Sequence, residues 1–198
     1  MKTIHVLLLL WLASPTMGQT ESYVQEACRV TRYRELCVHS LSSFSRTAKK
    51  NPSVWARAGV SVTIGEAKSV IRYLSGLKRY SLVKGKRNQA ALSDCIETFQ
   101  DALDSLHMSL GVLRELNAES FFSQVEDVTT WLSSALTDED TCTDGFNENE
   151  YPLLGSKKRR GNIIGNLRRK VVNASCITSN ALALVNRLET TGPGSLNL

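Results

Sequence analysis

The sequence predicts an all-α protein, an up-down-up-down four-helix bundle with an N-terminal disulfide-stapled helical hairpin. Four long segments repeat apolar residues at spacings of three and four, which is typical of amphipathic helices that bury one side. No proline lies between Pro52 and Pro152, and this long proline-free interval favours helices over a turn-rich β-fold. Mostly short links between the segments predict antiparallel neighbours, as in a four-helix bundle.

The first residues are predicted to be a signal peptide rather than part of the fold. Lys2 precedes an apolar run over residues 6–13, and small residues follow that are typical of a cleavage site near Gly18. The run is much shorter than the roughly 20 apolar residues that span a membrane. We therefore expect a secreted, extracellular protein without a membrane anchor.

The 198 residues are enough for one domain with its own core. We expect a signal peptide over residues 1–18 and a helical hairpin over residues 19–50. The four-helix bundle is expected over residues 51–190. Residues 191–198 contain a Gly-Pro-Gly sequence and are predicted to be a flexible tail.

The hairpin is predicted from two short helical pieces within residues 21–44. Cys28 and Cys37 lie close in sequence there, and a disulfide between them would stabilise helices that are marginal alone. Secretion favours disulfides, but an odd number of cysteines leaves at least one thiol unpaired, and four cysteines allow three pairings. The five cysteines are Cys28, Cys37, Cys95, Cys142 and Cys176.

The first long helix is predicted to begin at Asn51-Pro52, an N-cap residue followed by proline at the first helical position. Its apolar positions continue to Leu77, and Gly85 is predicted to end it. The second helix is predicted around residues 92–113, where apolar residues follow threes and fours and acidic residues lie on other faces.

The third helix is predicted over residues 119–136. Residues 137–140 (TDED) resemble a capping box, so we expect this helix to break at Thr137 and restart toward Phe146. Residues 147–160 are polar and contain glycine, which predicts a loop. The fourth helix is then expected over residues 163–188.

The sequence contains no recognisable catalytic pattern. His5 leaves with the signal peptide, and His39 and His107 stand alone, which favours structural or solvated roles. Phosphate-binding loops, nucleophile elbows and paired-histidine zinc motifs are not found. The acidic residues at 138–140 and Asp144 lack the pattern of a calcium loop. We expect neither an enzyme, nor a metal, nor a cofactor.

Basic residues cluster near the start of the fourth predicted helix, at Lys157, Lys158, Arg159 and Arg160. Behind a signal peptide such a run does not indicate nucleic-acid binding. It is either a solvated helix start or a surface that attracts an acidic wall polysaccharide or an acidic partner. Asn173 begins an Asn-Ala-Ser sequon and is the predicted glycosylation site.

Several short motifs together resemble the plant pectin methylesterase inhibitor family, within the wider invertase and pectin methylesterase inhibitor group. The resemblance extends over essentially all of the chain after the signal peptide. Each motif alone is weak, but the combination is specific. The motifs lie at residues 27–28 (AC), 36–37 (LC), 91–95 (ALSDC), 127–137 (DVTTWLSSALT), 140–146 (DTCTDGF) and 179–184 (SNALAL).

The resemblance implies a four-helix bundle with an N-terminal hairpin. It also implies the disulfides Cys28–Cys37 and Cys95–Cys142, with Cys176 unpaired. Members of the family form a reversible 1:1 complex with their target enzyme and cover its substrate cleft. The third bundle helix is prominent in that contact, so its polar face is the expected interface, namely Gln124, Asp127, Thr130, Ser134 and Thr137.

The expected partner is pectin methylesterase in the apoplast and cell wall. Invertase inhibitors of the group typically carry a Pro-Lys-Phe motif, whereas the corresponding residues 120–123 read SFFS. Two alternatives stay open: an inhibitor of acid invertase, and a non-inhibitory wall protein that binds acidic pectin through residues 157–160.

Overall fold

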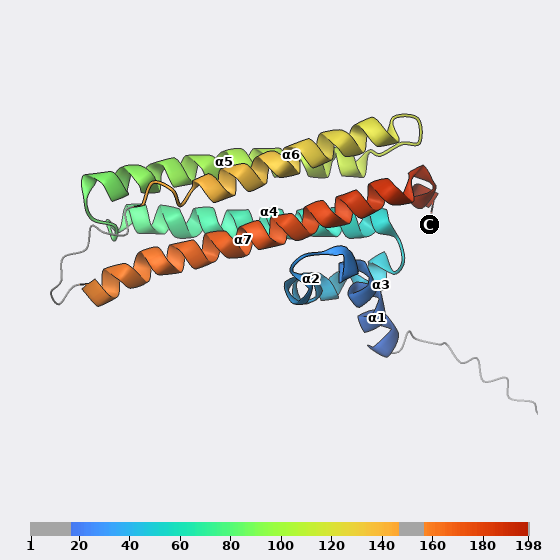
Figure 1. Ribbon diagram of the computed structural model, residues 1–198, viewed down its shortest axis with the longest axis horizontal. Coiled ribbons are helices and arrows are strands. Elements are labelled where there is room, and N and C mark those ends of the chain that lie inside the picture. Colours follow the sequence, from blue (N-terminus) through green and yellow to red (C-terminus); the bar gives the residue numbers. More distant parts are fainter. Residues whose placement is uncertain (1–16, 147–156, 198) are drawn as a thin grey trace, which may run out of the picture.

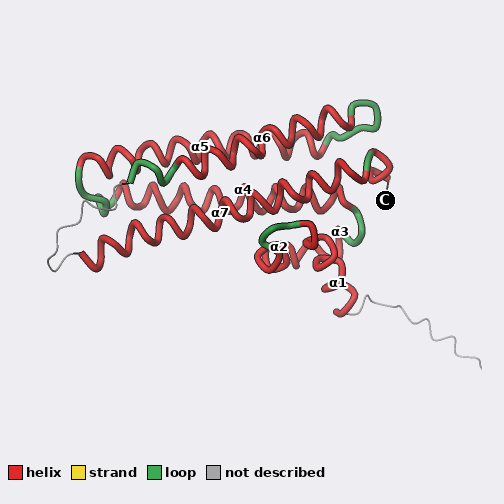
Figure 2. Tube along the Cα trace, in the orientation of Figure 1, coloured by secondary structure: helices red, strands yellow, loops and turns green. Residues whose placement is uncertain are grey.

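The computed structural model describes residues 17–146 and 157–197, and every regular element within those ranges is helical. The prediction of an all-α fold is confirmed. Four long helices lie side by side, and a group of short helices packs beside two of them (Figure 1). The described loops are short beside the helices that they join (Figure 2). The long helices are α4 (Pro52–Arg79), α5 (Lys86–Arg114), α6 (Phe121–Thr141) and α7 (Lys157–Thr191).

The four long helices surround one hydrophobic core. α4 and α6 each pack against both α5 and α7, and successive helices run in opposite directions (Figure 1). Large side chains that are fully buried, such as Phe99, Leu132 and Leu167, fill the centre. Each helix contributes one apolar stripe to this core, which agrees with the predicted periodicity.

The N-terminal hairpin forms a second, smaller core against the bundle. Val24 and Leu41 of the hairpin pack with Trp55 of α4 and Leu184 of α7. Asn180 of α7 fixes the hairpin loop, because its Nδ2 donates to the Tyr33 carbonyl at 3.0 Å and its Oδ1 accepts from the Tyr33 amide at 3.1 Å. The hairpin consists of α1 (Met17–Ala27), η1 (Cys28–Val30), α2 (Arg34–Leu41), η2 (Ser42–Phe44) and α3 (Ser45–Ala48).

The start of α4 agrees with its prediction, but its end does not. Asn51 Oδ1 accepts the Val54 N–H at 3.1 Å, and Pro52 is the first helical residue. The helix ends at Arg79 because Ser81 adopts a left-handed conformation, with φ of 47°. Gly85 was predicted to end this helix, and that prediction is wrong: with φ of 85° it immediately precedes α5.

The predicted break at Thr137 is also wrong, because α6 continues to Thr141. The Thr137 hydroxyl donates to the Ser133 carbonyl one turn earlier instead of capping a new helix. Glu139, one of the two residues between Thr137 and Asp140 in the predicted capping box, is completely buried. Residues 137–140 are thus part of α6 and place Glu139 against α7, an arrangement that the local sequence pattern did not indicate.

The last helix is longer than predicted. α7 begins at Lys157, so the final residues of the expected loop are helical, and the rest of that loop lies outside the described residues. Within the predicted tail, Pro193–Asn197 forms a 3-10 helix in which Ser195 is buried. Residues 1–16 of the predicted signal peptide lie outside the described ranges. None of the helices within those ranges has the length and apolarity that crossing a membrane requires.

Close packing of α4 on α7 at Gly59 generates a prediction about stability. A Cβ atom at Gly59 would lie 3.1 Å from Leu184 Cδ1 and 3.3 Å from Ala181 Cα. We expect Gly59→Val to lower the free energy of unfolding by about 1–3 kcal/mol, measured by urea denaturation, because α4 and α7 must separate. Gly65→Val is the control, since a Cβ at Gly65 meets nothing within 4 Å. Equal stability of the two variants would contradict this account.

Candidate functional site

The rotation of α6 about its axis is set by its buried stripe. Val125, Val128, Leu132 and Ala135 have no exposed surface and pack in the bundle core. A helix advances by 100° per residue, so burial of these positions turns the opposite positions to solvent. Exposed polar residues therefore lie in a line along the outside of the helix.

This line of exposed polar residues is longer and more regularly spaced than the predicted set of interface residues. Asp127, Thr130, Ser134 and Thr137 are all exposed, as predicted for four of the five interface residues. Ser123 and Thr141 are exposed at its two ends and complete a spacing of alternating fours and threes. We call these six residues the polar stripe of α6: Ser123, Asp127, Thr130, Ser134, Thr137 and Thr141.

Gln124, the fifth predicted interface residue, lies outside the polar stripe. Its side chain is half-buried and holds the link between α5 and α6: Oε1 accepts the Asn117 N–H at 3.0 Å, and Nε2 donates to the Glu115 carbonyl at 3.2 Å. Both polar ends of the amide are thus used within the chain. Contacts across a loop of this kind cannot be read from helical spacing.

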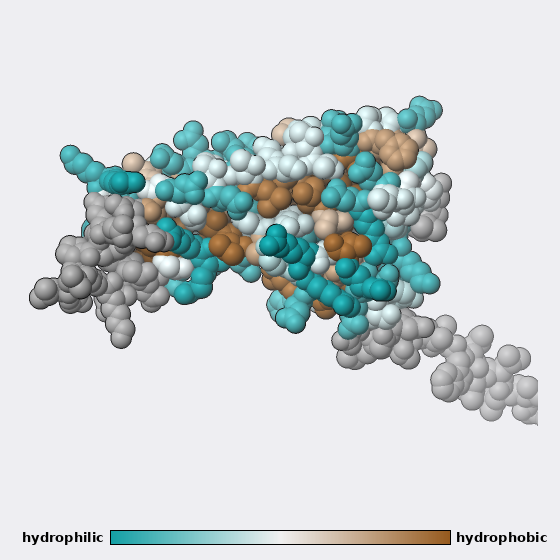
Figure 3. Space-filling model, viewed as in Figure 1, coloured by the Kyte–Doolittle hydropathy of each residue, from teal (hydrophilic) through white to brown (hydrophobic). Residues whose placement is uncertain are grey.

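An aromatic pair lies at the N-terminal end of α6. Phe121 is fully buried, whereas Phe122 is 60% exposed, and their rings meet edge to face with centroids 5.3 Å apart. The exposed ring of Phe122 offers apolar area beside the polar stripe. On the face seen in Figure 3, hydrophobic residues form small patches separated by hydrophilic ones. Recognition on that face must therefore depend largely on polar groups and isolated apolar side chains.

Charge is distributed unequally among the long helices. α6 contains five acidic residues and neither lysine nor arginine, and α5 contains four acidic and three basic residues. By contrast, α4 contains five basic residues and one acidic residue, and α7 contains eight basic residues and one acidic residue. Partial burial, together with the neighbouring carboxylate of Asp101, raises the pKa of Asp138. The polar stripe therefore lies on an acidic side of the bundle.

Glu139 is a buried acid that joins α6 to α7. Burial raises its pKa to about 8. Its Oε1 lies 2.9 Å from the Thr178 hydroxyl, which also lies 3.1 Å from the Ala174 carbonyl. The Thr178 hydroxyl donates to this oxygen, which by itself lowers the pKa of Glu139, but the loss of water on burial outweighs that effect. The neutral form of Glu139 therefore suits this position.

The cysteines pair in the structure as the resemblance implied. Cys28 is bonded to Cys37 inside the hairpin, and Cys95 of α5 is bonded to Cys142 at the end of α6. Cys176 of α7 is a half-buried free thiol. A hydrogen bond with the Cys176 side chain raises the pKa of Tyr33 in the hairpin loop. The second disulfide holds the C-terminal end of the polar stripe against α5.

Comparison with known proteins identifies the family. A family model described as plant invertase/pectin methylesterase inhibitor matches residues 22–184. The chain belongs to this inhibitor family. It is 48% identical over 170 residues to Pectinesterase inhibitor 6 of Arabidopsis thaliana, covering 86% of this chain and 77% of that protein. Pectinesterase inhibitor 9 of the same plant is 34% identical over 180 residues, covering 88% and 84%.

A solved structure supports the fold. The crystal structure of a mutant form of a pectin methylesterase inhibitor from Arabidopsis covers 80% of this chain and 92% of its own. Its TM-score is 0.56 at 18% sequence identity, so the likeness concerns the fold alone. The family and the relatives are named as inhibitors, and the chain accordingly belongs with inhibitors rather than enzymes.

The predicted glycosylation site, the basic run and the two histidines lie outside the polar stripe. Asn173 is half-buried in α7, and its Nδ2, the atom that would carry a glycan, donates to Glu66 Oε1 at 3.2 Å. Glycosylation would replace that hydrogen bond and stays a prediction. The backbone of Lys157, Lys158, Arg159 and Arg160 forms the start of α7, but their side chains lie outside the described residues. His39 and His107 are exposed, and the described residues include no group of three metal-binding side chains.

The buried acid generates a prediction about pH. The pKa of Glu139 is about 8 in the folded chain against 4.5 when exposed, so the folded state binds this proton more tightly. Its contribution to stability is complete below pH 4.5 and is lost as pH rises through 8. We expect Glu139→Gln to remove on the order of 1–3 kcal/mol of the decline in unfolding free energy between pH 5 and pH 8.

Denaturation with urea at several pH values measures this decline. Glu126→Gln is the matched control, because Glu126 is an exposed acid on the same helix. The control is expected to follow the parent chain. A Glu139→Gln variant with the same pH dependence as the parent would show that Glu139 does not titrate in this way.

Proposed function

We propose that the mature chain is a secreted inhibitor of pectin methylesterase that acts in the apoplast and cell wall. It forms a reversible 1:1 complex with the enzyme and covers the substrate cleft with the polar stripe of α6. The observation that carries this proposal is the unbroken exposed line from Ser123 to Thr141 in a member of an inhibitor family. The line is about 27 Å long at 1.5 Å per residue.

The side chains of the polar stripe suit a cleft that binds sugars. A polysaccharide-binding cleft presents donors and acceptors that normally meet sugar hydroxyl and carboxyl groups. Serine, threonine and aspartate offer the same groups, and these short side chains lose little conformational entropy when they are ordered. Since the stripe lies on one long helix supported by a core, its groups are also held in position before binding.

The acidic character of α6 favours a target whose cleft has a basic rim. Opposite charges on two partners raise the rate of association, and salt weakens this attraction. We therefore expect faster association at low ionic strength. The exposed ring of Phe122 adds an apolar contact at one end of the stripe.

A direct assay distinguishes the proposed function from two others, the inhibition of invertase and the binding of wall pectin. The family description includes invertase, but the relatives at 48% and 34% identity are named as pectinesterase inhibitors. Titration of the purified chain against a plant pectin methylesterase and an acid invertase, side by side, is expected to abolish only methylesterase activity, at an equimolar end point. Inhibition of invertase alone would contradict the proposal. Inhibition of neither enzyme would favour the wall-binding alternative through residues 157–160.

The contact surface is tested with a charge-reversal variant. We expect Asp127→Lys with Thr130→Lys to raise the apparent Kd for the methylesterase about tenfold to a hundredfold, because two long cations replace central acceptor groups. Glu189→Lys with Thr190→Lys is the matched control. It makes the same charge change at exposed positions near the end of α7.

Inhibition is measured as a function of inhibitor concentration, with circular dichroism to verify that each variant is folded. The control is expected to inhibit like the parent chain. Parent-like inhibition by the variant in α6 would show that the polar stripe is not the contact surface, even if the chain is an inhibitor.

A further inference from the structure

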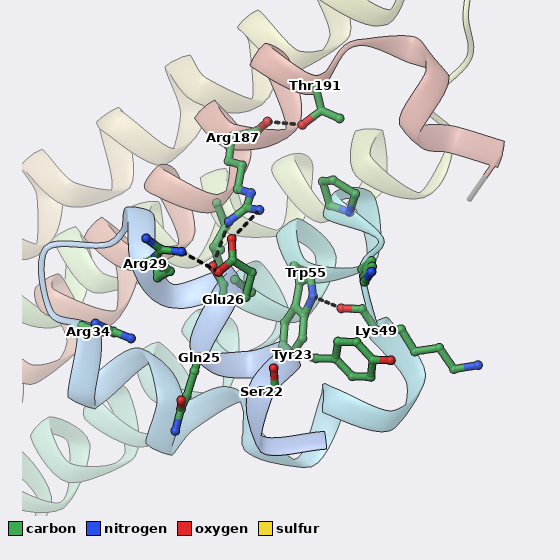
Figure 4. Close-up of a pocket in the computed structure, with 14 residues that line it drawn as sticks. Ser22, Tyr23, Gln25, Glu26, Arg29, Arg34, Lys49, Trp55, Arg187 and Thr191 are labelled. Carbon is green, nitrogen blue, oxygen red and sulfur yellow. Dashed lines mark hydrogen bonds and ion pairs between the residues drawn. The ribbon is translucent and has the colours of Figure 1, made fainter. Parts of the chain in front are cut away.

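A pocket lies where the hairpin meets α4 and α7, away from α6 (Figure 1). Its volume is about 870 Å³, and no residue of α6 lines it. Its walls come from α1, from Arg29 of η1 and Arg34 of α2, from the residues that follow α3, from the first turn of α4 and from the end of α7 (Figure 4). Its size lies within the range of about 300–1,000 Å³ that is usual for small-molecule sites.

The lining of this pocket is strongly basic. Among the described residues that line it are Arg29, Arg34, Lys49, Lys50 and Arg187, with Glu26 as the one carboxylate. Five cations in one hollow raise the local concentration of anions. An anionic ligand is therefore the natural occupant.

Glu26 organises two of these cations rather than neutralising the pocket. Its carboxylate lies 3.0 Å from Arg29 Nη1 and 3.6 Å from Arg187 Nη2, and Arg187 Nη1 donates to the Glu26 carbonyl at 2.9 Å. The guanidinium groups are thus held in place before a ligand arrives. Within the described part of the chain, Arg34, Lys49 and Lys50 form no ion pair, so their charges are available.

The basic groups are spread along the pocket instead of converging on one point. In Figure 4, Arg29 and Arg34 lie on one side, and Lys49 lies on the other. Tyr23 and Trp55 lie nearer to Lys49. Trp55 is only 4% exposed, and its Nε1 donates to the Lys49 carbonyl at 2.9 Å. This arrangement suits an extended ligand with several separated negative charges, and the half-buried Tyr23 offers a face on which a sugar ring can pack.

We propose that this pocket binds a short acidic oligosaccharide, a chain of uronic acid rings with one carboxylate on each ring. The pocket is large enough for about two or three rings. Arg34 and Lys50 would each bind a carboxylate, since charge-assisted hydrogen bonds are stronger than those between neutral groups. This site is separate from the run at residues 157–160 that the sequence indicated.

The choice of galacturonate as the sugar rests on the proposed function, because a pectin methylesterase converts neutral methyl esters into carboxylates. The affinity of the pocket for carboxylated sugars does not depend on inhibition. Binding is measured without any enzyme, so its outcome is independent of the inhibition assay. A chain that inhibits without binding the sugar, or binds without inhibiting, separates the two proposals.

The experiment is isothermal titration calorimetry of the parent chain with a trimer of galacturonic acid. We expect the trimer to bind, and its fully methyl-esterified form and inorganic phosphate to bind at least tenfold more weakly. Arg34→Gln with Lys50→Gln is expected to weaken trimer binding about tenfold or more. Lys78→Gln with Arg79→Gln is the control, because it removes the same charge at exposed residues of α4 that do not line the pocket.

A second readout locates the ligand. The indole N–H signal of Trp55 in NMR spectra is expected to shift on addition of the trimer, whereas that of Trp131 on α6 is not. Equal weakening in both double variants would show diffuse charge attraction and overturn the proposal. Equal binding of the methyl ester, equal binding of phosphate, or absence of binding to the trimer would overturn it as well.

Discussion

The structure depends on the burial of one apolar stripe on each of four long helices. These stripes leave water only by packing against one another, and this burial is the main favourable term in forming the bundle. On α6 the stripe from Val125 to Ala135 has no exposed surface. That burial fixes the rotation of the helix, and the polar stripe is its geometric complement. The same constraint that stabilises the core therefore presents the surface proposed to meet the enzyme.

The hairpin is a second unit, and its position against the bundle forms the basic pocket. Its small core with Trp55 and Leu184, together with the paired hydrogen bonds between Asn180 and Tyr33, holds it against α4 and α7. The short helices of the hairpin would be marginally stable alone. The Cys28–Cys37 disulfide stabilises them because it restricts the unfolded chain. The basic pocket exists because two units meet there, and neither unit contains it alone.

Charge separates the two surfaces. The polar stripe lies on a helix without lysine or arginine, whereas the described residues that line the pocket include five cations and one carboxylate. An acidic sugar would be repelled by the former and attracted by the latter. The two proposed ligands therefore have no reason to compete for one surface. A chain of this kind could inhibit its enzyme while it remains associated with the acidic polymer around it.

Much of this protein was determined by its sequence alone. Apolar spacing predicted four long helices and the exposure of Asp127, Thr130, Ser134 and Thr137, because helical periodicity is a local property. The tertiary structure decided what depends on distant partners. Glu139 is buried against Thr178 in a helix that continues past Thr137, and Gln124 holds a loop. The pocket draws on residues from Ser22 to Thr191. Such contacts join residues far apart in the chain, so a local sequence pattern cannot predict them.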